Sequence, residues 1–231
     1  MRQLERVIAS LCRKAVLAIL KENKKTIKVT KKLILEWLGK EMFEYGQKEK
    51  KNQIGVVTGL AYTSFGGDVL PVEVTYFEGN GKFIVTGQLG DVMKESTSIA
   101  LDYIKSNAKK YKIDPKFFDK HDIHIHVPEG AVPKDGPSAG VTLTTALVSA
   151  ITGTPVYSDL AMTGEVTLRG HVLAIGGLRE KSLAAHRVGI KKVIIPKSNL
   201  KDLDEIPETV KNDITFIPVE SMEQVLKEAL V

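Results

Sequence analysis

Residues 127–150, VPEGAVPKDGPSAGVTLTTALVSA, join two different kinds of sequence. Up to Pro137 the stretch contains three prolines and three charged residues, whereas from Ser138 onward it carries no charge. Proline fits the first turn of a helix, where its missing N–H leaves no hydrogen bond unmade. The pattern therefore predicts a rigid polar loop that leads directly into a buried helix, with Ser138 in the opening turn.

A serine at this position has chemical consequences. The first turn of a helix leaves backbone N–H groups unpaired, and the helix dipole adds partial positive charge there. Both would stabilise the oxyanion that forms when the Ser138 hydroxyl attacks a carbonyl group. Serines near helix N-termini also serve simply as caps, so the loop by itself leaves both interpretations open.

The residues GPSAG also match the G-x-S-x-G pattern of an α/β-hydrolase nucleophile elbow. In that elbow a strand ends at the nucleophile, whereas here a loop, residues 128–137, separates Ser138 from the nearest predicted strand. A serine–histidine–acid triad would draw its partners from His171 or His186 and from Asp159 or Glu165. This triad is the alternative to a site in which a lysine acts as the base for Ser138.

The stretch LREKSLAAHRV predicts a helix over residues 178–188, with Leu178, Ala185 and Val188 on one face. Lys181 falls in the middle of this apolar face. A lysine there either extends to water or stays desolvated, and desolvation favours its neutral form. Its ordinary pKa of ~10.4 must fall by about 3 units for a general base at neutral pH, which burial can produce. Lys181 is therefore a candidate base for Ser138.

The composition is that of a globular protein, with 43% hydrophobic and 26% charged residues in a chain of 231. The one cysteine, Cys12, excludes an internal disulfide and favours a reducing, cytoplasmic location. The longest uncharged apolar stretch, residues 139–157, is interrupted by threonines, Gly153 and Pro155. It predicts a core helix followed by a turn, so we expect no membrane partner.

The net charge of +5 is unevenly distributed. Residues 1–50 hold 13 Lys and Arg against 6 Asp and Glu, whereas the remaining residues hold 20 against 22. A solvated helical face explains the basic segment, so nucleic acid is not an expected partner. The non-enzymatic alternative is a module whose residues 1–50 bind nucleic acid or another partner.

Helical spacing dominates residues 1–45, where Thr30 is the predicted cap of a second helix and Gly39 its end. A polar linker, residues 45–53, follows. Beyond it we expect strands at 54–63, 68–77, 82–89, 122–127, 191–196 and 214–219, a hairpin at 165–175, and helices at 92–111, 137–148, 178–188 and the C-terminus. This order predicts an α+β (mixed α/β) fold in which helices pack on small mixed sheets.

Two blocks, PKDGPSAG at 133–140 and MTGEVTLRGHVLAIGGLREK at 162–181, resemble the signatures of the Lon protease proteolytic domain. GLAYTSFGGDVLPVEV, GQLGDVMKES and HIHVPEGAVPKDGPSAG are similar to bacterial members of that family, so the resemblance extends from about residue 51 to the C-terminus. RQLERVIASLCRKA and VTKKLILEWLG resemble the last helices of the AAA+ module that precedes it. The resemblance implies two domains, a helical AAA+ remnant at 1–46 and a proteolytic domain at 47–231.

The resemblance further implies a serine endopeptidase with a Ser–Lys dyad, in which Ser138 is the nucleophile and Lys181 the base. It implies that Thr163 lies near the lysine amine and that Asp135 and Glu165 are nearby. His124 and His126 share one face of the predicted strand, and two such ligands without a third indicate a structural pair rather than a metal site.

Lon-like enzymes are ATP-dependent proteases that degrade misfolded or regulatory proteins, and the resemblance implies unfolded or damaged proteins as substrates and a homo-hexamer for the full-length enzyme. This chain has no Walker motif, so we expect no cofactor here and expect ATP and Mg²⁺ to bind through the missing AAA+ module. Met1 directly before the helical tail indicates a truncated form of a longer protein.

Overall fold

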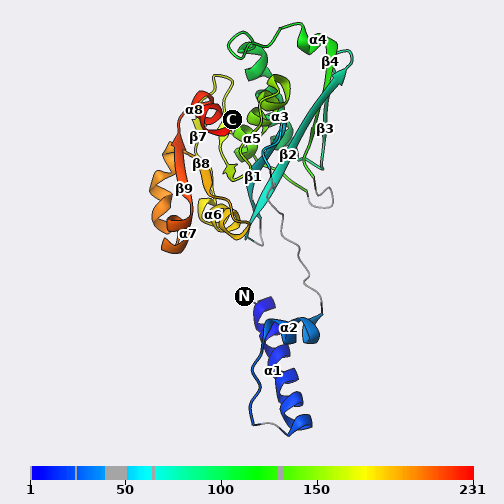
Figure 1. Ribbon diagram of the computed structural model, residues 1–231, viewed down its shortest axis with the longest axis vertical. Coiled ribbons are helices and arrows are strands. Elements are labelled where there is room, and N and C mark those ends of the chain that lie inside the picture. Colours follow the sequence, from blue (N-terminus) through cyan, green and yellow to red (C-terminus); the bar gives the residue numbers. More distant parts are fainter. Residues whose placement is uncertain (1, 24, 40–50, 64–65, 129–132) are drawn as a thin grey trace. The chain divides into compact units, whose positions relative to one another are not determined.

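The computed structural model describes residues 2–23, 25–39, 51–63, 66–128 and 133–231 (Figure 1). The chain forms two compact units, Met1–Tyr45 and Gly46–Val231. Within the described part, no helix is both long enough and apolar enough to cross a membrane.

The first unit consists of α1 (Arg2–Glu22) and α2 (Lys31–Leu38). The predicted cap of α2 is confirmed, because the Leu33 N–H donates a hydrogen bond to Thr30 Oγ1 at 3.3 Å. The predicted end of α2 is also confirmed at Gly39, which has a φ of 91°. None of the described side chains of this unit is fully buried, and several large apolar ones are exposed: Leu4, Ile8, Val16, Leu17, Leu20, Val29, Leu35 and Leu38.

The second unit is built on one seven-stranded mixed sheet, in the order β3-β4-β2-β1-β5-β8-β9. The strands are β1 (Val56–Thr63), β2 (Gly66–Glu78), β3 (Phe83–Thr86), β4 (His121–His126), β5 (Leu160–Met162), β8 (Lys192–Pro196) and β9 (Thr215–Val219). β2 runs antiparallel to β1 and β4, and the other neighbouring pairs are parallel. β6 (Glu165–Val166) and β7 (Val172–Leu173) form a separate hairpin.

The two faces of the sheet bury two separate cores, because successive side chains of a strand point to opposite faces. Val69 and Ala161 belong to one core, and their neighbours Leu70 and Met162 belong to the other. The larger core includes residues of α3 (Asp91–Ser106), α5 (Gly140–Thr152) and α8 (Met222–Ala229). The smaller one includes residues of α6 (Leu178–Arg187) and α7 (Glu208–Asp213). The 3₁₀ helix η2 (Lys197–Glu205) connects β8 to α7.

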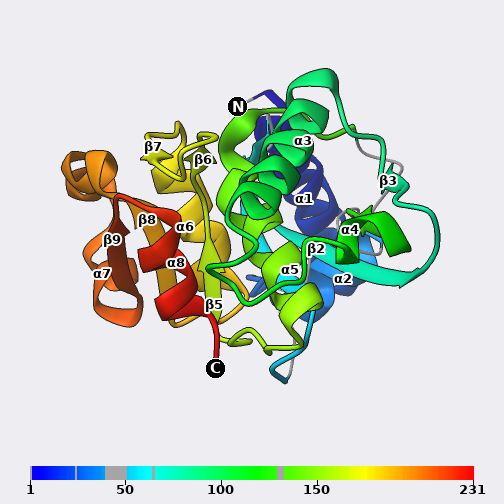
Figure 2. The same ribbon diagram turned by 90° about the horizontal axis from the view of Figure 1, so that it is seen from above.

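α5 is buried on all sides. It packs against α3, α8 and the strands β1 and β2 (Figure 2), and eleven of its thirteen residues are buried. Because no face of this helix meets water, a charged side chain would have no hydration there, which explains the uncharged sequence. The hydroxyls of Thr144 and Thr145 donate to the carbonyl groups of Gly140 and Val141, each at 2.8 Å.

The expected α+β class is confirmed, and the structure adds detail that the sequence pattern lacked. Seven strands join in one sheet instead of several small ones. Ser138 lies in a single turn of 3₁₀ helix, η1 (Pro137–Ala139), that leads into α5. α3 ends at Ser106, five residues before the expected end, and the short helix α4 (Phe117–Lys120) follows before β4.

Candidate active site

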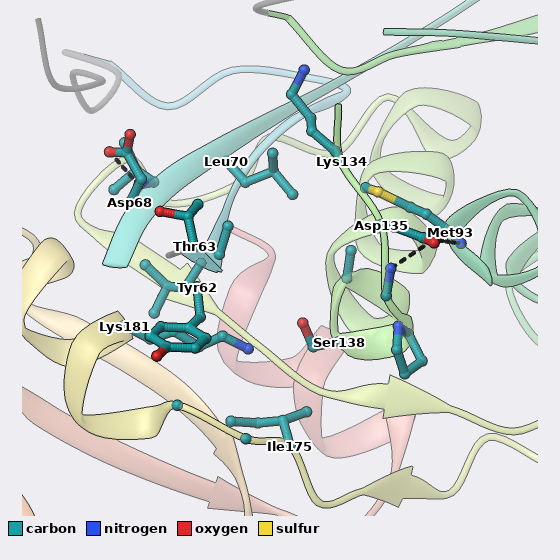
Figure 3. A pocket seen from close by; sticks show the side chains of 18 of the residues that line it. Tyr62, Thr63, Asp68, Leu70, Met93, Lys134, Asp135, Ser138, Ile175 and Lys181 are labelled. Atoms are coloured by element: carbon teal, nitrogen blue, oxygen red, sulfur yellow. Dashed lines mark hydrogen bonds between the residues drawn. The ribbon is translucent and has the colours of Figure 1, made fainter. Parts of the chain in front are cut away.

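A pocket of about 470 Å³ lies where the parallel strands β1 and β5 end (Figure 3). Its walls come from residues 60–63 and 68–70 of the β1–β2 pair, residues 133–139 before α5, and residues 174–177 before α6. Ser138 and Lys181, which the sequence singled out separately, both line it. The carboxyl ends of parallel strands are the usual place for a ligand in a mixed or parallel sheet.

The segment after β5 holds the start of α5 in place. The Gly164 N–H donates to the carbonyl oxygen of Ser138 at 2.9 Å, and the Val141 N–H donates to Gly164 O at 3.1 Å. A Cβ at Gly140 would lie 2.8 Å from the nitrogen of Val166, which leaves no room for a side chain there. The small residues around Ser138 therefore allow two backbone segments to meet.

Lys181 enters the pocket from the buried face of α6. Leu178, Ser182 and Ala185 share this face, and the Lys181 side chain is only 2% exposed. Its Nζ donates a hydrogen bond to Thr163 Oγ1 at 3.0 Å. Burial lowers the pKa of Lys181 from 10.5 to about 8, because desolvation penalises the charged ammonium.

No carboxylate within the described part of the chain forms an ion pair with Lys181. In Figure 3 its amine and the Ser138 hydroxyl point toward one another, and no direct hydrogen bond joins these two residues. The amine is therefore desolvated and faces a serine, and no carboxylate among the described residues holds it in the charged state.

Thr163 links the Lys181 side chain to the backbone of Ser138. It follows β5 directly and is fully buried. Its hydroxyl donates to the carbonyl oxygen of Ser138 at 3.3 Å and accepts from Lys181 Nζ. One threonine hydroxyl thus contacts both halves of the expected Ser–Lys pair.

The family model of the Lon protease (S16) C-terminal proteolytic domain matches residues 28–231 of the sequence. The chain belongs to the Lon proteolytic domain family. Over its whole length it is 58% identical to the Lon protease of Bacillus thuringiensis (strain Al Hakam) and 56% identical to Lon protease 1 of Bacillus subtilis (strain 168). Over 99% of its length it is 56% identical to the Lon protease of Brevibacillus choshinensis.

These relatives are much longer proteins. The chain covers 29%, 30% and 29% of their respective lengths. Membership in the Lon family makes the chain a proteolytic domain of the serine peptidase class, which confirms the enzyme class expected from the sequence.

The two acidic residues that the resemblance brought forward lie in different surroundings. Asp135 lines the Lon domain's pocket, but its carboxylate accepts hydrogen bonds from the backbone N–H groups of Met93 and Gly136 and not from Lys181. Glu165 lies in β6 and is not among the described residues that line the pocket.

The histidines of the alternative triad lie elsewhere in the Lon domain. His186 Nε2 is 2.7 Å from Asp213 Oδ2 at the surface of the smaller core. The backbone of His171 forms a bridge with Ser221. No histidine occurs among the described residues that line the pocket, and Asp159 is likewise absent from that lining.

His124 and His126 face the same side of β4, as expected, and both contact Thr86 on β3. Thr86 Oγ1 is 2.9 Å from His124 Nε2 and 2.7 Å from His126 Nδ1. Among the described residues, no three His, Cys, Asp or Glu side chains are grouped so that they could hold a metal ion.

Several pocket residues carried no signal in the sequence of this Lon domain. Leu70 and Met93 are buried apolar residues, and a strand or helix pattern shows only that such residues are in the core. Tyr62 and Ile175 also line the pocket. Only the packing of β1, β2, α3 and α6 shows that these four side chains surround the serine and lysine.

Proposed function

We propose that Ser138 and Lys181 form the catalytic dyad of a serine endopeptidase. The observation that carries this proposal is the buried Lys181 amine, which faces the Ser138 hydroxyl in one pocket and contacts Thr163 instead of a carboxylate. A lysine whose pKa is about 8 is substantially neutral at mildly alkaline pH, so it can accept a proton.

The chemistry follows in two halves. Neutral Lys181 takes the proton of the Ser138 hydroxyl as Oγ forms a bond to the peptide carbonyl carbon. The carbonyl oxygen becomes an oxyanion, which the backbone N–H groups around the start of η1 stabilise. Lys181 then returns the proton to the leaving amine as the C–N bond breaks. A water molecule that gives its proton to Lys181 then attacks the acyl carbon. Lys181 passes that proton to Ser138 Oγ as the ester bond breaks, which restores the free serine and the neutral lysine.

Thr163 keeps the amine in place for both halves. Its hydroxyl proton is directed at Ser138 O, so its lone pairs face Lys181 Nζ. Asp135 and Glu165 are supporting residues in this proposal, and neither exchanges a proton with the substrate.

The wider assignment concerns the longer protein. Residues 1–46 are the end of an AAA+ module and residues 47–231 are the proteolytic domain. The exposed apolar side chains of α1 and α2 support this, because such a short unit needs a larger module to cover them. ATP and Mg²⁺ bind in that module, since the sequence here contains no Walker motif for a triphosphate.

The full-length enzyme is an ATP-dependent, hexameric cytoplasmic protease that acts on unfolded, damaged or regulatory proteins. Peptide degradation by the present chain, with and without ATP, tests whether ATP acts only through the AAA+ module. The rate of cleavage of unfolded peptides should not depend on ATP. Stimulation by ATP would contradict the assignment.

A serine-directed phosphonate probe tests the dyad. The adduct should map to Ser138 by peptide mass spectrometry, and Ser138→Ala should lose both the adduct and the peptidase activity. Lys181→Arg should label much more slowly than wild type, because arginine cannot accept the hydroxyl proton. An adduct on another serine, or an active Ser138→Ala variant, would reject the proposal and return attention to a histidine-based triad.

A further inference from the structure

Asp135 binds the first turn of α3 as well as its own loop. Its Oδ1 accepts hydrogen bonds from the Met93 N–H at 3.0 Å and from the Gly136 N–H at 2.8 Å, both drawn in Figure 3. α3 begins after Gly90, which has no side chain to cap the helix. A carboxylate 42 positions further along the chain therefore pairs with one of the N–H groups that a helix start leaves open.

Backbone hydrogen bonds hold the same two segments together. The Gly90 N–H donates to Lys134 O at 2.7 Å, and the Lys134 N–H donates to Gln88 O at 3.1 Å. Leu89 and Lys134 thus form a parallel bridge. The loop that carries Ser138 is joined to the start of α3 immediately before Asp135, so the carboxylate completes a connection that the backbone begins.

Gly90 leaves the space that the carboxylate occupies. A Cβ at this position would lie 2.4 Å from Asp135 Cγ and 2.5 Å from Oδ2. The φ of Gly90 is −69°, which any residue can adopt, so its backbone conformation does not require glycine. The requirement for glycine comes from the contact with Asp135.

Ser138 is thereby held from both sides. On one side the Asp135 carboxylate accepts from the Met93 N–H of α3 and from the Gly136 N–H of its own loop. On the other side the carbonyl oxygen of Ser138 accepts from Gly164 N–H and Thr163 Oγ1. The hydroxyl has no hydrogen bond of its own to the other residues drawn in Figure 3. Its position relative to Lys181 depends on the backbone at these two attachments.

We propose that Asp135 is a positioning residue that fixes the Ser138 loop to the first turn of α3 and so keeps the nucleophile in reach of Lys181. This inference rests on the proposed Ser–Lys dyad. Asp135 acts by accepting two backbone N–H bonds. The competing explanation is that the negative charge of Asp135 acts on Lys181 directly. The two explanations predict opposite results for Asp135→Asn, which keeps the shape of the side chain and removes its charge.

Three variants and a control separate these explanations. Asp135→Asn keeps an oxygen that accepts N–H bonds but removes the charge, whereas Asp135→Ala removes both. Gly90→Ala leaves Asp135 intact and displaces its carboxylate. Asp91→Ala is the matched control, because the Asp91 side chain is 96% exposed and pairs with Lys94 on its own helix.

The readouts are kcat and KM for a fluorogenic peptide, the pH profile, and amide hydrogen exchange of residues 133–139. Asp135→Ala and Gly90→Ala should lower kcat by about tenfold or more with little change in KM, because a displacement on the order of 1 Å can cost ~10²-fold. Exchange in 133–139 should accelerate in both. Asp135→Asn should keep most of the activity, Asp91→Ala should resemble wild type, and the midpoint of the pH profile should not move.

Equal loss in Asp135→Asn and Asp135→Ala with a shifted pH midpoint would overturn the proposal in favour of a charge effect on Lys181. Wild-type kcat in Gly90→Ala and Asp135→Ala would also overturn it, provided that Ser138→Ala is inactive. An active Ser138→Ala would instead reject the dyad itself. If Asp135→Ala does not fold, Gly90→Ala and Asp135→Asn still test the proposal. Gly90→Ala disturbs the contact between Asp135 and α3, whereas Asp135→Asn preserves it.

Discussion

Thr163 Oγ1 accepts a hydrogen bond from Lys181 Nζ at 3.0 Å and donates one to the carbonyl oxygen of Ser138 at 3.3 Å. A hydroxyl has one proton, so donation to the carbonyl oxygen leaves only lone pairs for the lysine. One N–H of the amine is therefore directed at Thr163, and the remaining positions on nitrogen are open toward the serine. The threonine orients the base as well as contacting it.

Thr163→Val should reduce kcat substantially while the domain stays folded. Valine keeps the shape but can neither accept from Lys181 nor donate to Ser138 O, so the base loses its orientation. We expect a fall of roughly 10- to 100-fold in kcat for a peptide substrate. Thr163→Ser retains the hydroxyl and is the control, with activity near wild type. Full activity in the valine variant would show that the hydroxyl has no part in orienting the amine.

Lys181→Arg should stay folded and lose peptidase activity. Arginine keeps the positive charge and most of the aliphatic stem, but a guanidinium does not lose its proton in a protein. We expect a loss of about 10²- to 10⁴-fold, the range for removal of acid–base catalysis. Near-normal turnover would exclude Lys181 as the base.

The pH profile of the wild type provides a second measurement on the same residue. Activity should rise with pH as the Lys181 ammonium deprotonates, with a midpoint near its pKa of about 8. A midpoint close to the ordinary lysine pKa of ~10.4 would indicate an exposed amine. The residual activity of Lys181→Arg should lack this rise.

Burial of Lys181 also predicts a pH-dependent stability. Below about pH 8 the folded domain holds a buried ammonium, and its lowered pKa corresponds to a cost of roughly 3 kcal/mol. Between about pH 8 and 10.5 the folded state releases this proton while the unfolded chain retains it, so the free energy of unfolding rises with pH.

Lys181→Met removes this contribution, since methionine does not titrate. Urea unfolding at several pH values should show the variant more stable than wild type at neutral pH, with the difference shrinking as pH approaches 10.5. Taking the difference between the two proteins cancels the other groups that titrate in this range. A constant difference across pH would mean that Lys181 is not desolvated.

The place of Ser138 before a buried helix and of Lys181 on a buried helix face was predictable, because each is marked by a local pattern. Ser138 lies where a charged, proline-rich loop meets an uncharged helix, and Lys181 interrupts the apolar face of a helix. Nothing local indicated that Asp135 would cap a helix 42 positions away, since that contact depends on how α3 packs against α5. The resemblance to a family suggested acidic residues near the lysine, but it did not indicate which groups hydrogen-bond to their carboxylates.

The fold was predictable to the level of its class. β4 and the middle of β2 alternate between apolar and polar residues, and the amphipathic α3 has helical periodicity. β5 has three residues, all buried, and is too short to show any period. This strand joins β1 to β8 in the sheet and leads to Thr163, so its absence from the expected elements explains why one large sheet was not foreseen.

Thr142 provides a test of packing that is independent of catalysis. It lies on α5, is fully buried, and within the described part of the chain its Oγ1 has no hydrogen-bond partner. An unpartnered buried hydroxyl costs about 1–3 kcal/mol, so Thr142→Val should raise the free energy of unfolding by about 1 kcal/mol. Gly59 faces this side chain, since a Cβ at Gly59 would lie 3.0 Å from Thr142 Oγ1. Thr145→Val is the control, because Thr145 Oγ1 donates to Val141 O at 2.8 Å and its removal breaks a hydrogen bond.

Thermal unfolding of the two variants should place the midpoint of Thr142→Val above that of wild type and the midpoint of Thr145→Val at or below it, with peptidase activity retained in Thr142→Val. The opposite order would mean that the Thr142 hydroxyl has a partner.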